Sequence, residues 1–254
     1  MAVPFILCEK AYKMGIEEWI SMDYSISSHT LWAGRTGSGK SVASKILLAQ
    51  TILHAPPELQ PVELTVIDPK EDTEFQFLEG NPRFFSREAT PEGFNDFYSQ
   101  YLQRKNKQDL TKNLKILFVD EFASLITLIT DKKEREATQN KLALLLMLSR
   151  SRFFSIQMAT QQPSARIFGE NASASREQFG KVCLLGDSGT ETQTMLFDSK
   201  SREKMSQYGE IGGRGVGWLS TNGGTAQPVK VPFVASMGKL NKVIYDCMAR
   251  QSAT

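Results

Sequence analysis

Cysteine is scarce in this chain of 254 residues, and the three that occur, Cys8, Cys183 and Cys247, are far apart and odd in number. Their spacing fits no metal-binding pattern, so we interpret them as reduced thiols of a cytoplasmic protein. A run of about 18 apolar residues is also missing, so we expect no membrane-spanning segment. The segment Met1–Leu7 is too short for a signal peptide and lacks its basic start.

An excess of charge of one sign is absent too, because 30 Lys and Arg stand against 28 Asp and Glu, for a net charge of +2. This balance neither demands nor excludes nucleic acid, since a ring-shaped binder needs positive charge only where the polymer passes. We find no internal repeat, no low-complexity tract and no long linker. The length therefore suits one α/β domain, alone or with small additions.

One glycine-rich stretch dominates what is present: Gly34-Arg35-Thr36-Gly37-Ser38-Gly39-Lys40-Ser41 fits the phosphate-binding pattern G-x-x-x-x-G-K-[ST]. The glycines let backbone N–H groups turn toward phosphate oxygens, Lys40 adds a charge for the β- and γ-phosphates, and Ser41 supplies a Mg²⁺ ligand. A chance match is the alternative. The context argues against chance, because residues 29–33 predict a buried strand and a helical stripe follows, with Val42, Ile46, Ala49 and Leu53.

A second motif follows the apolar run of residues 116–119, which is typical of a strand buried in a parallel sheet. It is the pair Asp120-Glu121. A carboxylate at this place can hold Mg²⁺, as a Walker B Asp does, and the adjacent Glu121 can polarise an attacking water. The alternative is a pair of acids that begins the next helix, residues 122–129.

The rest of the chain alternates between strands and helices. A strand at residues 155–160 ends in Gln161, whose amide would sense the γ-phosphate or orient water; a polar strand exit is the alternative. Further strands are predicted at 62–67 and 182–185, and a hairpin around Asn222-Gly223-Gly224 precedes a last helix. Helix starts are predicted from Thr90-Pro91-Glu92 and from a capping box at 188–191, and residues 104–107 are read as a solvated helix end. The pattern predicts an α/β fold with a mostly parallel sheet, in which residues 1–28 are a lead-in packed on a single domain of residues 29–254.

These motifs together resemble the motor domain of the FtsK/SpoIIIE DNA translocases, within the FtsK–HerA group of RecA-like P-loop ATPases. The resemblance rests on the P-loop, Ile67-Asp68-Pro69-Lys70, Val119-Asp120-Glu121-Phe122-Ala123 and Ala159-Thr160-Gln161-Gln162-Pro163, although the family usually has Arg where this chain has Gln162. Residues 176–180, Arg-Glu-Gln-Phe-Gly, are similar to the R-D-N-F-G of TcpA-like coupling proteins. The likeness extends over roughly residues 25–235. It comes without a membrane anchor and without a sequence-reading winged helix, as in small FtsK-like proteins of mobile elements.

The resemblance implies an ATP- and Mg²⁺-dependent homo-hexamer that moves along double-stranded DNA without sequence preference and serves transfer, segregation or replication. A relaxase, a replication protein or a membrane anchor is then a partner on another chain. Family sequences carry an Arg eleven residues before the sensor Gln, which implies Arg150 as the finger that acts on the next subunit, with Arg152 second; neutralisation of a helix end is the alternative. Pore-facing loops imply phosphate contacts from four basic residues, Lys132, Lys133, Arg135 and Arg166.

Two other functions remain open. A coupling or secretion ATPase that moves protein, or protein-linked DNA, would keep the same nucleotide site. A nucleotide switch or small-molecule kinase is the third possibility, but a kinase is expected to lack the Asp-Glu pair, so Glu121 favours hydrolysis.

Overall fold

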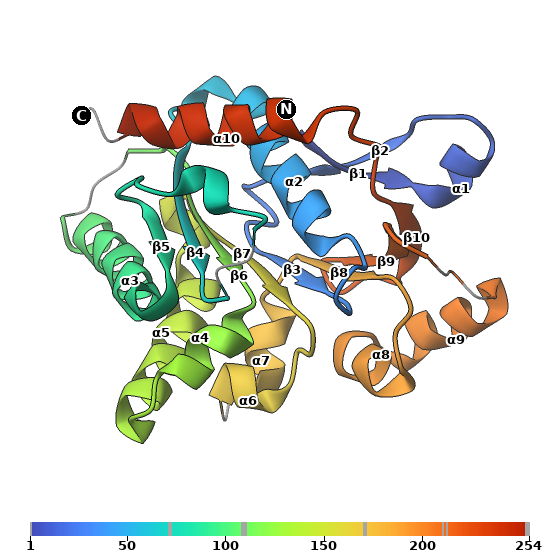
Figure 1. Ribbon diagram of the computed structural model, residues 1–254. Coiled ribbons are helices and arrows are strands. Elements are labelled where there is room, and N and C mark those ends of the chain that lie inside the picture. Colours follow the sequence, from blue (N-terminus) through green and yellow to red (C-terminus); the bar gives the residue numbers. More distant parts are fainter. Residues whose placement is uncertain are drawn as a thin grey trace.

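A computed structural model describes residues 2–70, 73–107, 111–169, 172–209, 211 and 213–251. Within these residues, ten strands form one sheet in the order β2-β1-β10-β9-β8-β3-β7-β6-β4-β5 (Figure 1). The strands are β1 (Val3–Cys8), β2 (Trp19–Met22), β3 (Thr30–Ala33), β4 (Glu63–Asp68), β5 (Phe84–Ser86), β6 (Lys115–Asp120), β7 (Phe154–Thr160), β8 (Lys181–Leu185), β9 (Val216–Thr221) and β10 (Gln227–Lys230). The six strands from β8 to β5 run parallel, and the other four pair antiparallel. The predicted α/β class with a mostly parallel sheet and a C-terminal hairpin is confirmed.

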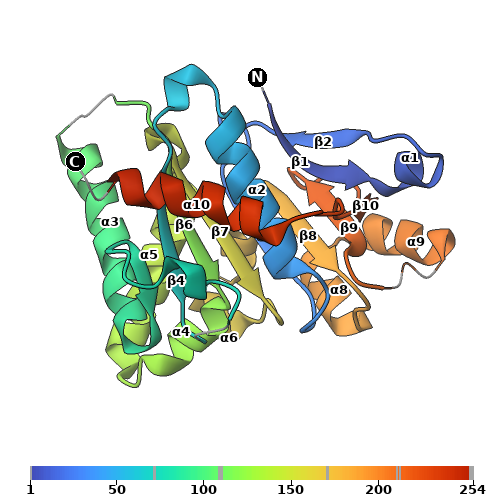
Figure 2. The same ribbon diagram turned by 45° about the horizontal axis from the view of Figure 1, so that its top comes forward.

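Helices cover both faces of this sheet (Figures 1 and 2). One face carries α2 (Lys40–His54) and α10 (Met237–Gln251), and the other carries α3 (Thr90–Asn106), α4 (Phe122–Leu128), α5 (Lys132–Leu148), α6 (Ala165–Phe168) and α7 (Ala172–Glu177). Beside β8 and β9 lie α8 (Thr190–Leu196) and α9 (Ser199–Tyr208), and α1 (Glu9–Lys13) joins β1 to β2. Short 3₁₀ helices are η1 (Pro57–Leu59), η2 (Gln76–Leu78), η3 (Arg87–Ala89) and η4 (Arg150–Arg152).

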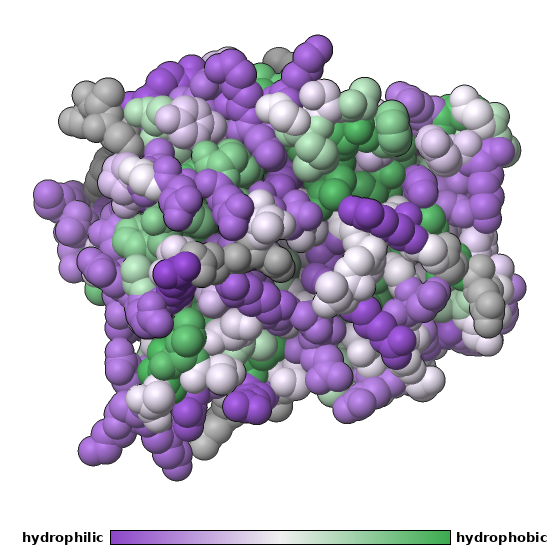
Figure 3. Space-filling model, in the orientation of Figure 1, coloured by the Kyte–Doolittle hydropathy of each residue, from purple (hydrophilic) through white to green (hydrophobic). Residues whose placement is uncertain are grey.

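The apolar strands supply two separate cores because successive side chains of a strand point to opposite faces. In β6, Phe118 enters the core under α2 and α10, whereas Leu117 and Val119 enter the core under α3, α4 and α5. A continuous apolar run is therefore what a strand covered on both faces requires. Outside, most of the face in Figure 3 is hydrophilic, with hydrophobic residues gathered between the beginning of α10 and β1. Among the described helices, none combines the length and the apolar character that a membrane span requires.

The strand order places three chemical motifs at one edge of the sheet. β3 lies between β7 and β8, and β6 is the next strand beyond β7. The strand predicted at residues 155–160 is β7, and it lies between the P-loop strand β3 and the strand β6 that ends in Asp120. Since these strands are parallel, the segments that follow β3, β6 and β7 leave the sheet at the same edge.

The N-terminal segment forms two strands that the sequence did not predict. β1 pairs antiparallel with both β2 and β10 and extends the sheet beyond the hairpin of β9 and β10. Its Phe5 is 1% exposed and stacks on Trp32 of β3 with ring centroids 5.1 Å apart. The strands β1 and β2 therefore pack on the core as an extension of the sheet.

The two predicted helix caps are wrong in detail. The N-cap of α3 is Ala89, and the Thr90 hydroxyl donates to the carbonyl of Arg87 at 2.7 Å. The N-cap of α8 is Gly189, without a side-chain bond, while the hydroxyl of Ser188 accepts from Gln193 at 3.3 Å. Both helices still begin where predicted, because α3 has Pro at its second position and both helices have an acid in the first turn.

Two side chains differ from the prediction in their solvent exposure. Leu53 is 59% exposed, near the C-terminal end of α2. Arg104 is 6% exposed rather than solvated, because its guanidinium donates to the carbonyls of Asn113 and Arg152, each at 3.0 Å, and lies 5.0 Å from the centroid of the Phe154 ring. A basic residue near a helix end thus became an internal hydrogen-bonding group once the neighbouring segments folded onto it.

Candidate active site

The glycine-rich loop joins β3 to α2 with backbone conformations that require glycine. Gly34 has φ 144°, and a Cβ at this position would lie 2.3 Å from the carbonyl oxygen of Leu185. Gly39 has φ 101° and is the N-cap of α2, with no side-chain cap. The first N–H groups of this 15-residue helix are therefore not capped by a side chain at the loop, which is the arrangement of a phosphate-binding helix start.

Lys40 lies in the curl of this loop. Its Nζ donates to the carbonyls of Gly34 at 2.6 Å and Arg35 at 3.0 Å, and the residue is only 9% exposed. Burial lowers the pKa of Lys40, while the charges of Glu121 and Asp120 act in the opposite direction. The loop thus holds a partly desolvated cation next to the two acids.

The loop and the acids line a common cavity of about 270 Å³. Ser41 contributes a half-buried hydroxyl to it, and Asp120, at the end of β6, is 7% exposed. Burial raises the pKa of Asp120 to about 7, and the negative charges of Asp68 and Glu121 add to this effect. A cation placed here would relieve the repulsion between these carboxylates.

This donor set fits Mg²⁺. In phosphate-binding sites Mg²⁺ takes one or two carboxylates and completes its shell with phosphate and water oxygens. Within the described residues, no group of three or more His, Cys, Asp or Glu is arranged to hold a metal by itself. The assignment of Mg²⁺ to Ser41 and Asp120 fits these side chains and stays a prediction.

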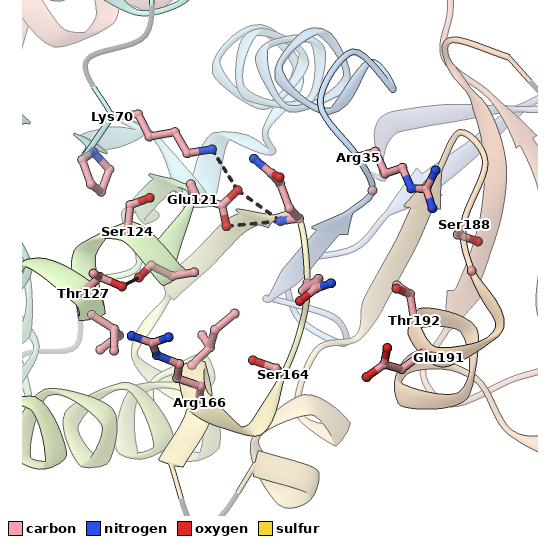
Figure 4. Close-up of a pocket in the computed structure, with 18 of the residues that line it drawn as sticks. Arg35, Lys70, Glu121, Ser124, Thr127, Ser164, Arg166, Ser188, Glu191 and Thr192 are labelled. Atoms are coloured by element: carbon pink, nitrogen blue, oxygen red, sulfur yellow. Dashed lines mark hydrogen bonds and ion pairs between the residues drawn. The ribbon is translucent and has the colours of Figure 1, made fainter.

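Glu121 is held by donors from two neighbouring strands (Figure 4). Its carboxylate accepts from the backbone N–H of Gln161 at 3.1 and 3.2 Å and from Nζ of Lys70 at 3.1 Å. It also accepts from the hydroxyl of Thr160 at 2.9 Å. Its backbone has φ 64°, a conformation that costs free energy for a residue with a side chain. Glu121 is thus held in a strained backbone conformation, and the residue is 5% exposed where it lines the cavity.

Sequence reasoning gave no role to Lys70 and Thr160, although both belong to the quoted motifs. Lys70 follows β4 and Thr160 ends β7, so each reaches Glu121 only through the sheet. Arg214, which precedes β9, also lines the cavity and was not singled out. The motifs that contain Lys70 and Thr160 do not show that they reach Glu121, and Arg214 belongs to none of the quoted motifs.

A larger groove of about 800 Å³ continues from Glu121. Gln161 is exposed and lies on its wall, and Figure 4 shows Arg166 and Glu191 farther along the same opening. The exposed amide of Gln161 and the carboxylate of Glu121 thus face solvent-accessible space next to the phosphate-binding loop.

Comparison with known proteins shows which proteins this chain is similar to. The sequence profile of the FtsK/SpoIIIE family matches residues 5–99. Over 89% of its length the chain is 24% identical to the DNA translocase FtsK of Oceanobacillus iheyensis and 25% identical to the DNA translocase SpoIIIE of Bacillus subtilis. These matches support an FtsK-type motor domain. The chain spans about a third of the length of these curated relatives, 31% and 30%.

Solved structures share the fold of this motor domain. The pCW3 conjugation coupling protein TcpA, in its monomer form with ATPγS, superposes with a TM-score of 0.65 at 19% identity, over 89% of this chain and 67% of TcpA. The cytoplasmic domain of the type VII secretion ATPase EccC of Thermomonospora curvata also gives a TM-score of 0.65, at 14% identity, over 92% of this chain and 26% of EccC. At these identities the likeness shows the fold alone.

The fold places the predicted arginine finger away from its own P-loop. Arg150 lies in η4, before β7 begins, whereas the P-loop follows the other end of the parallel strand β3. Its side chain is exposed and donates to the carbonyl of Ser25. Arg152 is half-buried, and its carbonyl accepts from Arg104.

The basic residues predicted to contact DNA lie on two helices, three at the beginning of α5 and one on α6. Lys132 and Lys133 are exposed in the first turn of α5, where Lys132 pairs with Glu136 at 3.7 Å. Arg135 is half-buried and donates to the carbonyl of Ile129 at 3.4 Å. Arg166 is exposed on α6 and lines the larger groove. The assignment of all four to DNA stays a prediction.

Proposed function

We propose that this motor domain hydrolyses ATP with Mg²⁺. The observation that carries the proposal is the common cavity in which Lys40, Ser41, Asp120 and Glu121 meet. The similarity to FtsK and SpoIIIE over 89% of this chain supports it, because a DNA translocase needs an energy source.

The roles of the residues follow from their positions. Lys40 and the first N–H groups of α2 bind the phosphates, and Ser41 with Asp120 holds Mg²⁺, which when bound supplies positive charge to the phosphate oxygens. Glu121 accepts the proton of the attacking water, and Thr160, Lys70 and the N–H of Gln161 orient its carboxylate. The side chain of Gln161 orients water or senses the γ-phosphate.

We further propose that hydrolysis drives translocation along double-stranded DNA by a homo-hexameric ring. The names of the relatives, DNA translocase FtsK and DNA translocase SpoIIIE, support this substrate. In the ring, Arg150 would complete the next subunit's site, with Arg152 as the second choice, and Lys132, Lys133, Arg135 and Arg166 would contact phosphates. Residues 29–254 would form the motor and residues 1–28 its lead-in.

The likeness to TcpA supports a role in the transfer, segregation or replication of a mobile element, with the chain in the cytoplasm and a relaxase, replication or anchoring partner on another chain. The likeness to EccC favours a second candidate, a secretion-type or coupling ATPase that moves protein or protein-linked DNA.

The deciding experiment measures the ATPase rate with and without long double-stranded DNA, at low and at raised salt. We expect stimulation by DNA of any sequence and a steep decline of this effect with salt, because phosphate contacts release counterions. The Lys40→Ala variant serves as the control for contaminating ATPases. Hydrolysis that no length of DNA stimulates at low salt would contradict the DNA proposal and favour a protein cargo.

A further inference from the structure

The turn before β9 is attached directly to the P-loop. The N–H of Gly215 donates to the carbonyl of Ser38 at 2.8 Å, and the carbonyl of Gly215 accepts from the N–H of Val231 at 2.7 Å. A Cβ placed on Gly39 would lie 3.2 Å from the Cα of Gly215 and 3.9 Å from Cγ of Arg214. The backbone of this turn and the stem of Arg214 therefore lie against the glycine that begins α2.

Arg214 places a positive charge at this position that has no partner among the described residues. Its side chain is exposed and lines the same 270 Å³ cavity as Lys40 and Ser41. The two lysines of the cavity wall already have partners, since Lys40 donates to loop carbonyls and Lys70 pairs with Glu121. None of the described residues gives Arg214 a hydrogen bond or an ion pair.

The direction from which Arg214 enters separates it from the hydrolytic groups. Glu121 and Gln161 come from the flank of β6 and β7, whereas Arg214 comes from the flank of β8 and β9, on the other side of β3. The largest charge effects on Asp120 come from Asp68, Lys70, Glu121 and Lys40. A phosphate chain bound at the loop would thus have the carboxylates at one side and Arg214 at the other.

We propose that Arg214 binds the α- or β-phosphate of the nucleotide held by its own subunit. The backbone N–H groups of a P-loop surround the α- and β-phosphates, while its Lys reaches the β- and γ-phosphates. Arg214 lies over Gly39, which belongs to that surrounding backbone. A guanidinium presents a planar fork of donors that matches phosphate oxygens, and exposed space around it lets the fork turn to them. This assignment rests on the proposed nucleotide site and adds a phosphate ligand from outside the P-loop.

The test compares the affinities of four chains for Mg²⁺-ADP and for a non-hydrolysable ATP analogue, by equilibrium titration with fluorescent nucleotides. The chains are the unaltered protein, Arg214→Ala, Arg214→Lys and the control Arg250→Ala, which removes an exposed arginine from α10. We expect Arg214→Ala to weaken both nucleotides by the same factor, about 10- to 100-fold, as for a lost hydrogen bond between charged groups. Arg214→Lys should recover part of this loss, and Arg250→Ala should change nothing.

Each of the other possible outcomes of these titrations contradicts the proposal in a different way. Equal affinities for Arg214→Ala and Arg250→Ala would show that Arg214 is a solvated surface residue. Weaker binding of the ATP analogue with unchanged ADP binding would move the contact to the γ-phosphate and overturn the assignment. A lowered melting temperature together with no recovery in Arg214→Lys would assign the loss to the fold of the turn. If the unaltered chain binds neither nucleotide, the proposed function itself fails, and this outcome differs from a failure of Arg214 alone.

Discussion

The hydroxyl of Thr160 offers a sharp test of how the site positions its base. It donates to Oε1 of Glu121 at 2.9 Å, lies 3.2 Å from the carbonyl of Gln162, and belongs to a fully buried residue. The substitution Thr160→Val removes the hydroxyl and keeps the branched shape that packs in β7. We predict that it slows hydrolysis and leaves nucleotide affinity unchanged, because Thr160 contacts the base and not the phosphate-binding loop.

The size of the effect follows from the donors that remain. A hydrogen bond to a charged group contributes about 1.5–3 kcal/mol. Glu121 would keep Nζ of Lys70 and the N–H of Gln161, so we expect the lower end of this range. About 1.4 kcal/mol corresponds to a tenfold change in rate, so kcat should fall roughly tenfold. Removal of the base itself should cost more, about 10²- to 10⁴-fold.

The assay is the steady-state ATPase rate, which gives kcat and KM, together with the nucleotide affinity measured separately. Thr160→Ser is the matched control, because it keeps the hydroxyl and removes only the methyl group. We expect the Ser variant to stay within about twofold of the unaltered protein, far less than the tenfold loss expected for a missing hydrogen bond. Equal losses in the Val and Ser variants would assign the effect to packing, and no loss in either would refute the positioning role.

Four further predictions concern single residues. Lys40→Ala should abolish ATP turnover while the thermal unfolding transition is kept, and turnover near the normal rate would contradict the site. Glu121→Gln should retain ATP after purification but not hydrolyse it, which measurement of bound nucleotide and product checks; an active variant would move the base elsewhere. Arg150→Ala should assemble and bind ATP yet barely turn it over, and mixing with Lys40→Ala should restore some activity, so mixed rings without recovery would exclude a trans finger. Burial lowers the pKa of His29 to about 3, so the folded state resists a proton that the unfolded chain binds below about pH 6.5, and stability should fall as pH drops from about 6.5 toward 3, by at most about 1.4 kcal/mol per pH unit. Urea unfolding across this range should give a shallower slope for His29→Asn and an unchanged slope for the exposed His54→Asn, and equal slopes in all three would refute the linkage.

The local chemistry of the site could be predicted because it is contiguous in the chain. The loop from Gly34 to Ser41 needs a fixed order of glycines, a lysine and a hydroxyl, since one turn of backbone surrounds the phosphates. The pair Asp120-Glu121 could be recognised because an uninterrupted apolar strand leads to it. The start signal Thr90-Pro91-Glu92 likewise predicted where α3 begins.

The environment of these groups could not be predicted because it depends on strands that are distant in sequence. Thr160 and Lys70 reach Glu121 across 39 and 51 positions, through the pairing of β7 and β4 with β6. The residues of β1 and β2 show no dominant helical or alternating period. These strands form because they pair with each other and with β10. Arg104 looked solvated because its partner Asn113 and the ring of Phe154 come from other segments.

The sequence alone determined that the chain builds a phosphate loop, a strand that ends in two acids, and an α/β sheet to join them, since each of these is a local pattern of size, polarity and backbone freedom. Only the tertiary structure decided which groups surround them. It brought Arg214 against Gly39 from the far flank of β3, and it gave Glu121 its three donors. The physical reason is that hydrogen bonds and charges act over a few ångströms in space, and the sheet order sets which residues come within that range.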